Sequence, residues 1–289
     1  EIKIFREQIV PYWKGKSLED VIKQNFGKEI SAINKVVKIN QTDHAQGHIC
    51  PNVEKWLQKG VSGLLEAAQN HYKNADEDKK NFYQAIIIVM KAVQNFMLRY
   101  HDLLIATAKD DEKNRASLIK VADICKNISQ RPPQTFHEAV QATWFLFVIL
   151  HMESNASSFS PGRLDKILYP YYIKDIENNI LTKDEALEII ECLWLKFNEI
   201  VYLRNQHSAK YFAGFPIGFN IAVGGVDEQG NDFSNDLSEL FLSAQEDLGL
   251  PQPNLSVRLH EKTNDKLLKY AIRVVAKGSG MPQFFNDKA

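Results

Sequence analysis

Two stretches that favour loops carry side chains able to do chemistry. Residues 46–52 read Gln-Gly-His-Ile-Cys-Pro-Asn, where His48 can donate or accept a proton and Gly47 permits close approach of the backbone to a ligand. Residues 153–158 read Glu-Ser-Asn-Ala-Ser-Ser and follow an apolar run, which places Ser157 and Ser158 at the end of a buried element. Polar groups at such a point either satisfy structural hydrogen bonds or bind a ligand, and the residues alone leave both open.

Other site motifs receive little support. His44 and His48 have a spacing that can hold a metal, but the Glu of the zinc-protease pattern is absent, and Gly47 and Pro51 favour a loop. Residues 227–232 are acidic but lack the glycine of a calcium loop, so they indicate a turn. The sequence contains no GxGxxG, GxxxxGK[ST] or GxSxG. We therefore expect no metal site, no nucleotide-binding fold and no α/β-hydrolase.

Composition and charge narrow the class of protein. The chain has 289 residues, of which 44% are hydrophobic, and 35 basic against 36 acidic residues give a net charge of -1. This balance provides no electrostatic footprint for nucleic acid or for an anionic membrane. The longest apolar runs, residues 85–90 and 144–150, fall far short of the roughly 18 residues that span a bilayer. Because the chain begins with Glu1 rather than Met, we expect its true amino terminus to be missing.

Three cysteines, Cys50, Cys125 and Cys192, stand far apart without a CxxC pair. They suggest neither a disulfide framework nor a zinc ribbon, and a reducing cytoplasm fits them best. We expect structural or bystander thiols, with Cys125 and Cys192 on apolar helical stripes. The amides around Cys50, at the start of a helix, are expected to lower the pKa of its thiol.

Hydrophobic periodicity predicts a helix-rich α/β protein. The boundary best defined by sequence is the capping box from Thr182 to Glu185, and residues 17–20 make a weaker one. Short β-branched runs then alternate with helices of crossover length, which favours parallel strands in a sheet or barrel. We read one domain cut open at both ends, with exposed strand edges and apolar helix faces. The predicted helices are 51–72, 77–108, 111–128, 134–152, 182–203, 236–248 and 263–277, and the predicted strands are 217–224, 255–260 and 283–285.

Five motifs in order resemble the glycyl radical enzyme family. They are Gly-His-x-x-Pro ending at Pro51, the island Ser-Pro-Gly-Arg-x-Asp-x-x-x-x-Pro-Tyr-Tyr over residues 160–172, Val-Gly-Gly over 223–225, Pro-Gln-Pro-x-x-Ser-Val-Arg over 251–258, and Pro-x-x-Phe-Asn-Asp over 282–287. The pattern is closer to the glycerol dehydratase, hydroxyproline dehydratase and related lyase branch than to pyruvate formate-lyase proper.

The resemblance implies a fold and a chemistry. Residues 1–289 would be a single pyruvate formate-lyase-like domain, incomplete at both ends and forming part of a ten-stranded β/α barrel. No cofactor is bound in this family; a separate S-adenosylmethionine radical activase installs an organic glycyl radical. The radical passes to a cysteine, whose thiyl radical takes hydrogen from a small polar substrate before C–O or C–C cleavage. The implied partners are the substrate, the activase and a second copy in a homodimer of the full-length enzyme.

The resemblance also assigns residues. His48 matches the pocket histidine of the dehydratases, and Ser158 matches their substrate-contacting serine. Ser157 stands where the glycerol enzyme has a second histidine, which puts glycerol itself in doubt. The Gly-Cys-Val/Ile-Glu and Arg-Val-x-Gly-Tyr motifs of the thiyl cysteine and the radical glycine do not occur in this sequence. We therefore expect no catalytic residue here, and no activity from this chain alone.

Three functional readings follow. The leading one is a fragment of a glycyl radical lyase or dehydratase. A formate acetyltransferase of the same family is the nearest alternative, and a non-catalytic scaffold or one half of a split enzyme is another. The residues leave open which substrate is used and whether it undergoes dehydration, decarboxylation or acyl cleavage.

Overall fold

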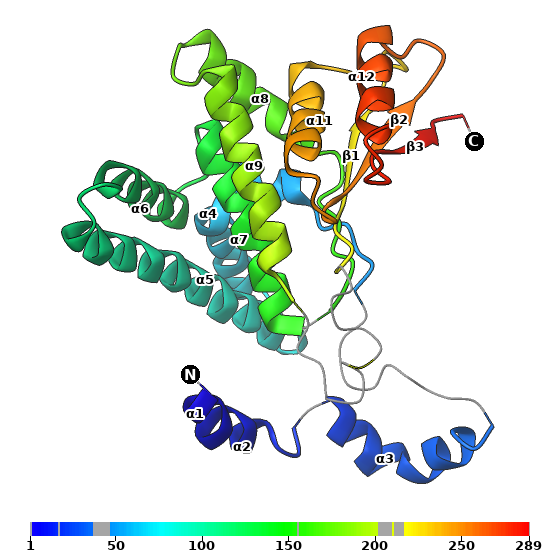
Figure 1. The fold of residues 1–289 in the computed structure, drawn as a ribbon. Helices are drawn as coiled ribbons and strands as arrows, with labels where there is room; N and C mark the ends of the chain where they lie inside the picture. Colours follow the sequence, from blue (N-terminus) through cyan, green and yellow to red (C-terminus); the bar gives the residue numbers. More distant parts are fainter. Residues whose placement is uncertain are drawn as a thin grey trace.

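The protein consists of helices packed against a small parallel sheet (Figure 1). A computed structural model describes residues 2–16, 18–36, 47–154, 156–201, 210 and 217–288. Its elements are α1 (Ile2–Ile4), the π-helix η1 (Phe5–Ile9), α2 (Val10–Trp13), α3 (Leu18–Ile33), α4 (Val53–Lys73), α5 (Glu77–Asp110), α6 (Arg115–Gln130), α7 (Phe136–Ser154), α8 (Leu164–Glu177), α9 (Lys183–Glu199), β1 (Asn220–Gly224), α11 (Asp236–Leu248), β2 (Asn254–Leu259), α12 (Asp265–Val275) and β3 (Gln283–Asn286).

The helices predicted by periodicity are confirmed within a few residues. Helix α9 begins after the predicted capping box, in which the Glu185 amide donates to the Thr182 hydroxyl and the Glu185 carboxylate accepts from the Thr182 amide. Helix α8 lies outside the predicted helices and contains Pro170, which interrupts the helical hydrogen bonds. It forms because Leu168 and Tyr172 on the same face are buried in the core.

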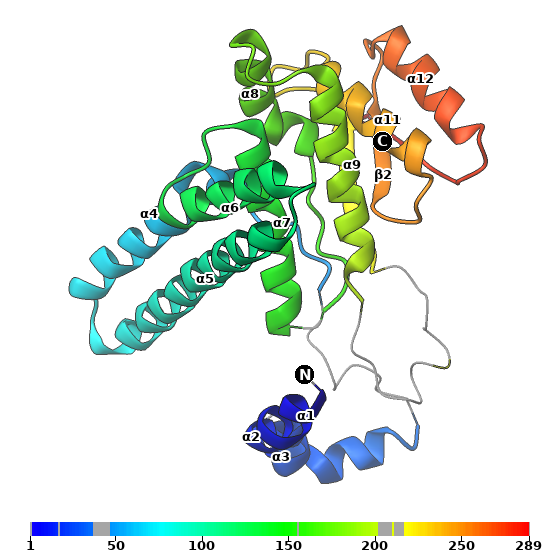
Figure 2. The same ribbon diagram turned by 60° about the vertical axis from the view of Figure 1, so that its left-hand side comes forward.

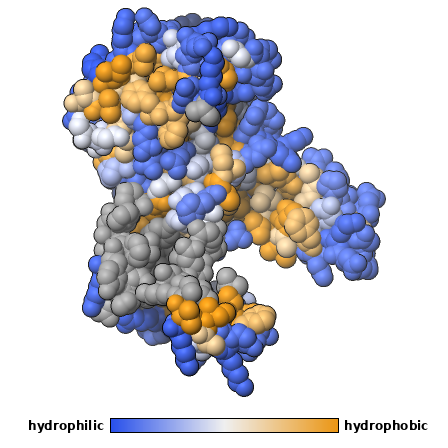
Figure 3. Space-filling model, turned by 90° about the vertical axis from the view of Figure 1, so that its right-hand side faces the viewer, coloured by the Kyte–Doolittle hydropathy of each residue, from blue (hydrophilic) through white to orange (hydrophobic). Residues whose placement is uncertain are grey.

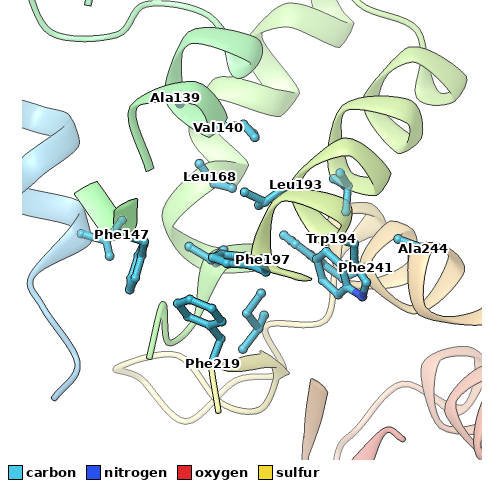
Figure 4. Close-up of a cluster of buried hydrophobic side chains, with 14 of the residues drawn as sticks. Ala139, Val140, Phe147, Leu168, Leu193, Trp194, Phe197, Phe219, Phe241 and Ala244 are labelled. Carbon is cyan, nitrogen blue, oxygen red and sulfur yellow. The ribbon is translucent and has the colours of Figure 1, made fainter. Parts of the chain in front are cut away.

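The core lies between α7, α9 and the sheet. Figure 4 shows Phe147, Phe197 and Phe219 gathered there, with Trp194 close to Phe241. The rings of Phe197 and Phe219 are 4.5 Å apart between centroids. All these side chains are fully buried, and burial of each contributes about 1.5–3 kcal/mol relative to exposure. This core fastens the start of β1 to two helices that lie much earlier in the sequence.

The predicted strands are confirmed as parallel neighbours in the order β1-β2-β3. Asn220 of β1 is opposite Asn254 of β2, and Ser256 of β2 is opposite Gln283 of β3. The parallel array extends beyond these strands. Phe159 forms a parallel bridge with Ile49, and Gly162 forms one with Ile221 of β1; the Ser160 amide donates to the Ile49 carbonyl and the Ala222 amide to the Gly162 carbonyl.

The array ends at an exposed strand. All four residues of β3 are exposed, and Phe285 retains 54% of its accessible surface. On the face shown in Figure 3, patches of hydrophobic residues interrupt the hydrophilic surface. Helices α1 to α3 stand apart from the other helices in Figures 1 and 2, and they expose Phe5, Tyr12 and Trp13. These features agree with the expected exposed edges and apolar faces. In the described part of the chain, no helix combines the length and hydropathy required to cross a membrane.

Candidate functional site

The two predicted binding loops meet through their backbones. The His48 amide donates to the Ser157 carbonyl oxygen over 3.0 Å. A Cβ atom at Gly47 would stand 1.5 Å from the same oxygen, so only glycine allows this approach. Gly47 is buried, while the neighbouring His48 is exposed. The structure therefore brings together two loops that are far apart in the sequence.

Ser158 joins these loops to the segment that enters β1. Its amide donates to the Ile217 carbonyl oxygen over 3.0 Å, and its hydroxyl lies 3.5 Å from that oxygen. At Gly218, a Cβ atom would stand 3.0 Å from the Ser158 Oγ, so the missing side chain leaves space beside the hydroxyl. The backbones of His48, Ser157 and Ser158 thus lie together at the amino end of the array. Convergence of their side chains on one cavity stays a prediction.

His48 and Ser158 share an unusual backbone conformation. Their φ angles are 63° and 58°, in the left-handed region that few residues other than glycine adopt. Such a conformation costs on the order of 1 kcal/mol or more and is frequent at functional sites. We therefore treat both positions as candidate functional residues whose side-chain direction is set by an unusual backbone conformation. The residue types alone did not predict this conformation.

The helix-facing side of this region is apolar. The His151 ring on α7 packs edge-on against Phe159 and Phe219, with centroid separations of 4.8 and 5.1 Å. Burial lowers the pKa of His151 to about 4, so the imidazole is neutral at pH 7. Its Nε2 atom is buried and has no hydrogen-bond partner in the described part of the chain. His151 therefore packs on the apolar side of this region, directly after the apolar run of residues 144–150.

The cysteine thiols are protonated at neutral pH. Burial raises the pKa of Cys50, which corrects the lowering expected from nearby amides. Loss of hydration around the sulfur, which faces Gly162, outweighs any favourable amide dipole.

Cys125 is buried and its pKa is raised to about 11 by burial. Cys192 lies on α9 but is exposed, contrary to its expected place on a buried stripe, because no described element covers that face of the helix. Burial, with Glu188 and Glu191 adding to it, still raises its pKa.

A second polar cluster lies at the carboxyl end of the array, built from the Ser-Pro-Gly-Arg island. The Arg163 guanidinium donates to the carbonyl oxygens of Gly224 and Val226 over 2.6 and 2.8 Å. One oxygen of Asp165 accepts from the Gly224 amide and the Ser238 hydroxyl, each over 2.7 Å. Asp165 is fully buried, and burial raises its pKa to about 6. These charged side chains hold backbone together.

The remaining motifs assemble at the same end. Asp287 accepts from the Val226 amide over 2.9 Å and from the Arg258 Nε over 2.7 Å. The Val-Gly-Gly, Ser-Val-Arg and Asn-Asp motifs therefore meet at one edge of the sheet. Sequence reasoning gave them no common role, although carboxyl ends of parallel strands do meet at one edge. Gly218 and Gly225 are seven positions apart along an extended segment, so this cluster lies roughly 20 Å from Ser158.

Of the two segments considered as metal sites, residues 227–232 form a turn, and the His44 segment is only partly described. Asp227 accepts from the amides of Gln229 and Asn231, which confirms the predicted turn at residues 227–232. His44 lies outside the described residues. Among the residues that are described, no group of three or more His, Cys, Asp or Glu is arranged to hold a metal.

Comparison with known proteins covers the whole chain. The family model described as pyruvate formate lyase-like matches residues 1–289. The probable dehydratase YbiW of Escherichia coli (strain K12) is 34% identical over 304 residues, which cover 100% of this chain and 37% of the relative. The (2S)-3-sulfopropanediol dehydratase of Klebsiella oxytoca is 32% identical over 98% of this chain and 36% of the relative.

Two solved structures are similar. The glycerol-bound B12-independent glycerol dehydratase from Clostridium butyricum superposes with a TM-score of 0.88 at 32% identity, covering 98% of this chain and 37% of that structure. Hydroxyproline dehydratase from Clostridioides difficile, with trans-4-hydroxy-L-proline bound, also gives 0.88 at 31% identity, covering 99% and 38%. This chain thus spans little more than a third of the length of these relatives. A family match over residues 1–289, together with these relatives, shows that the chain belongs to the pyruvate formate lyase-like family of glycyl radical enzymes.

Proposed function

We propose that this chain is the amino-terminal and middle part of a glycyl radical lyase or dehydratase that cleaves a C–O or C–C bond of a small polar substrate. The main observation in support of the proposal is the hydrogen bond from the His48 amide to the Ser157 carbonyl oxygen. Gly47 packs directly against the same oxygen. It joins the two loops predicted to bind substrate. The named dehydratases among the relatives support this branch of the family.

In this proposal His48, Ser157 and Ser158 bind the polar groups of the substrate. An imidazole and two hydroxyls offer both donors and acceptors, which suits a molecule carrying hydroxyl groups. Such groups can hold a leaving group in one orientation while the reaction proceeds. Because Ser157 is smaller than the imidazole expected in a glycerol enzyme, the pocket has more room and lacks a second imidazole that could act as a general acid. We therefore expect the substrate to be larger than glycerol or to carry a different charge.

The radical chemistry itself comes from outside residues 1–289. A glycyl radical, installed by a separate S-adenosylmethionine radical activase, would supply hydrogen abstraction through a cysteine. Neither the cysteine motif nor the glycine motif occurs in this sequence, so this chain alone is proposed to be inactive. In the full-length protein we propose a cytoplasmic homodimer that meets its activase and its substrate there.

The activity is tested in two steps. Anaerobic treatment of the 289-residue chain with an activase should give no glycyl doublet by electron paramagnetic resonance, and a doublet would refute the proposed inactivity. The gene should then be sequenced in both directions, and the complete protein should be activated and assayed with glycerol, 1,2-propanediol and trans-4-hydroxy-L-proline.

Substitutions in the complete protein test the site. His48→Ala and Ser158→Ala should each lower turnover at least about tenfold while the radical signal is retained. Ser279→Ala is the matched control, because within the described structure its hydroxyl bonds only to the local backbone of Met281. Turnover unchanged in both site variants would refute the assignment, and release of formate with acyl transfer to coenzyme A would favour the acetyltransferase instead.

A further inference from the structure

The carboxyl ends of the three strands are tied together by side chains that the proposed reaction does not use. Arg163, which precedes α8, binds the carbonyl oxygen of Val226, and Asp287, which follows β3, accepts from the amide of the same residue. Arg258 of β2 donates to the other oxygen of Asp287 over 2.7 Å. The carbonyl and the amide of Val226 are therefore both bound by charged side chains: Arg163 comes from the segment beside β1, and Asp287 comes from the segment after β3.

Asp287 and Arg258 are removed from water to a large extent, so each depends on its hydrogen-bond partners. The side chain of Asp287 is only 7% exposed, and that of Arg258 is 29% exposed. A carboxylate removed from water is costly unless hydrogen bonds and an opposite charge compensate for it. Asp287 has both, from the Val226 amide and from Arg258. Truncation of either charged partner would leave the other partly buried and uncompensated.

The arrangement closes only around a glycine. Gly225 has a φ angle of 79°, and a Cβ atom there would stand 2.8 Å from the Asp287 Oδ2 and 2.9 Å from the Arg258 Cβ. Its carbonyl oxygen accepts from the Phe233 amide over 2.8 Å, which fixes the turn that follows β1. A side chain at position 225 would separate Asp287 from Arg258 and strain the backbone as well.

Strand β3 has few other attachments in the described structure. It pairs with β2, and the Asp287 amide donates to the Leu259 carbonyl over 2.9 Å. Its four residues are classed as exposed, with Phe284 and Phe285 retaining 39% and 54% of their accessible surface, so burial of apolar surface contributes less to its docking than it does for β1 and β2. A short exposed edge strand of this kind is marginally stable from pairing alone. The Asp287 carboxylate is a link that reaches past β2 to the turn after β1.

We propose that Arg163, Arg258 and Asp287 form a clasp around Gly225 that fixes the register of the array at its carboxyl end. While the clasp is closed, β3 stays docked on β2. When it opens, β3 detaches locally and the helical body stays folded. This device is independent of the proposed enzymatic activity, since it lies at the opposite end of the array from His48 and Ser158.

Hydrogen exchange of the 289-residue chain, followed by NMR, tests the clasp. The reporters are the amide of residue 287, bonded to Leu259, and the Phe233 amide, bonded to Gly225, because neither uses the Asp287 carboxylate as its acceptor. Asp287→Ala should accelerate exchange of both reporters at least about tenfold, while amides in α5 and α6 keep their rates. Glu261→Ala is the control, because it removes only the exposed Lys288 pair beside the same strand.

Two further variants keep the test decisive if Asp287→Ala does not fold. Asp287→Asn keeps an acceptor for the Val226 amide but removes the charge, so it should give a smaller acceleration. Gly225→Ala leaves all three charged residues in place and should accelerate both reporters as Asp287→Ala does. Unchanged reporters in both variants, equal effects from Glu261→Ala, or equal acceleration in α5 and α6 would overturn the proposal.

Discussion

Asp165 should make this protein less stable as the pH rises, the reverse of the usual carboxylate behaviour. Its side chain is fully buried, and its Oδ1 atom has no hydrogen-bond partner among the described residues. Burial raises its pKa from 3.8 to about 6, against the opposing effects of the Ser238 hydroxyl, the Gly224 amide and the charge of Arg163. The folded protein therefore binds a proton at this carboxyl more tightly than the unfolded chain does.

The sign and size of the effect follow from linkage. A raised pKa in the folded state stabilises the protein fully below pH 3.8, and this contribution declines until the pH exceeds about 6. The difference between the two pKa values, at 1.36 kcal/mol per pKa unit, corresponds to about 3 kcal/mol. Asp165→Asn removes the titrating group but keeps an oxygen acceptor for Gly224 and Ser238. Relative to the unsubstituted protein, the variant should therefore gain about 2.4 kcal/mol between pH 4 and pH 7, because part of the contribution is already lost at pH 4.

Urea unfolding at intervals from pH 4 to pH 7.5, followed by tryptophan fluorescence, measures this difference. Subtracting the two free energies of unfolding at each pH cancels the contributions of the other titrating groups. Ser238→Ala is the control: it removes one hydrogen bond to Asp165 and the acceptor of the Asn235 amide in the α11 capping box, costs about 1–2 kcal/mol, and should retain the pH dependence. A difference between D165N and the unsubstituted protein that is constant with pH, or that changes in the opposite direction, would show that folding does not raise the pKa of Asp165 and would refute the reasoning.

Three further outcomes are expected. Glu138→Ala should lower the free energy of unfolding by about 2–3 kcal/mol in urea, because Arg131 and the Gln134 amide lose a buried acceptor; a loss below about 0.5 kcal/mol would contradict this. Gly47→Ala should displace Ser157 and accelerate exchange of the His48 amide, whereas Gly230→Ala, which meets no atom within 4 Å, should leave that amide unchanged; equal rates in both variants would contradict the contact. In the folded protein, Cys192 should react with a thiol reagent faster as the pH rises above 8 and Cys125 should not react, and rapid modification of Cys125 without unfolding would show that its burial is wrong.

The sequence by itself determined those parts of the fold that depend on local signals. Apolar periodicity located most helices, and the Thr182 capping box placed the start of α9, because both act within a few residues of the chain. The alternation of β-branched runs with helices also indicated the parallel strands. Helix α8 was not predicted, because Pro170 disfavours a helix. Burial of α8 side chains against distant residues overrides this poor helical preference.

For the candidate site, the sequence and its family resemblance selected His48, Ser157 and Ser158 but not their geometry. Only the tertiary structure decided that Gly47 packs on the Ser157 carbonyl, and that His48 and Ser158 adopt positive φ angles. It also decided that Arg163 and Asp165 bind backbone at the other end of the array, and that burial raises the pKa of Cys50. The reason is physical: close contacts between distant backbone segments and the loss of hydration depend on which segments meet, and no local pattern encodes that.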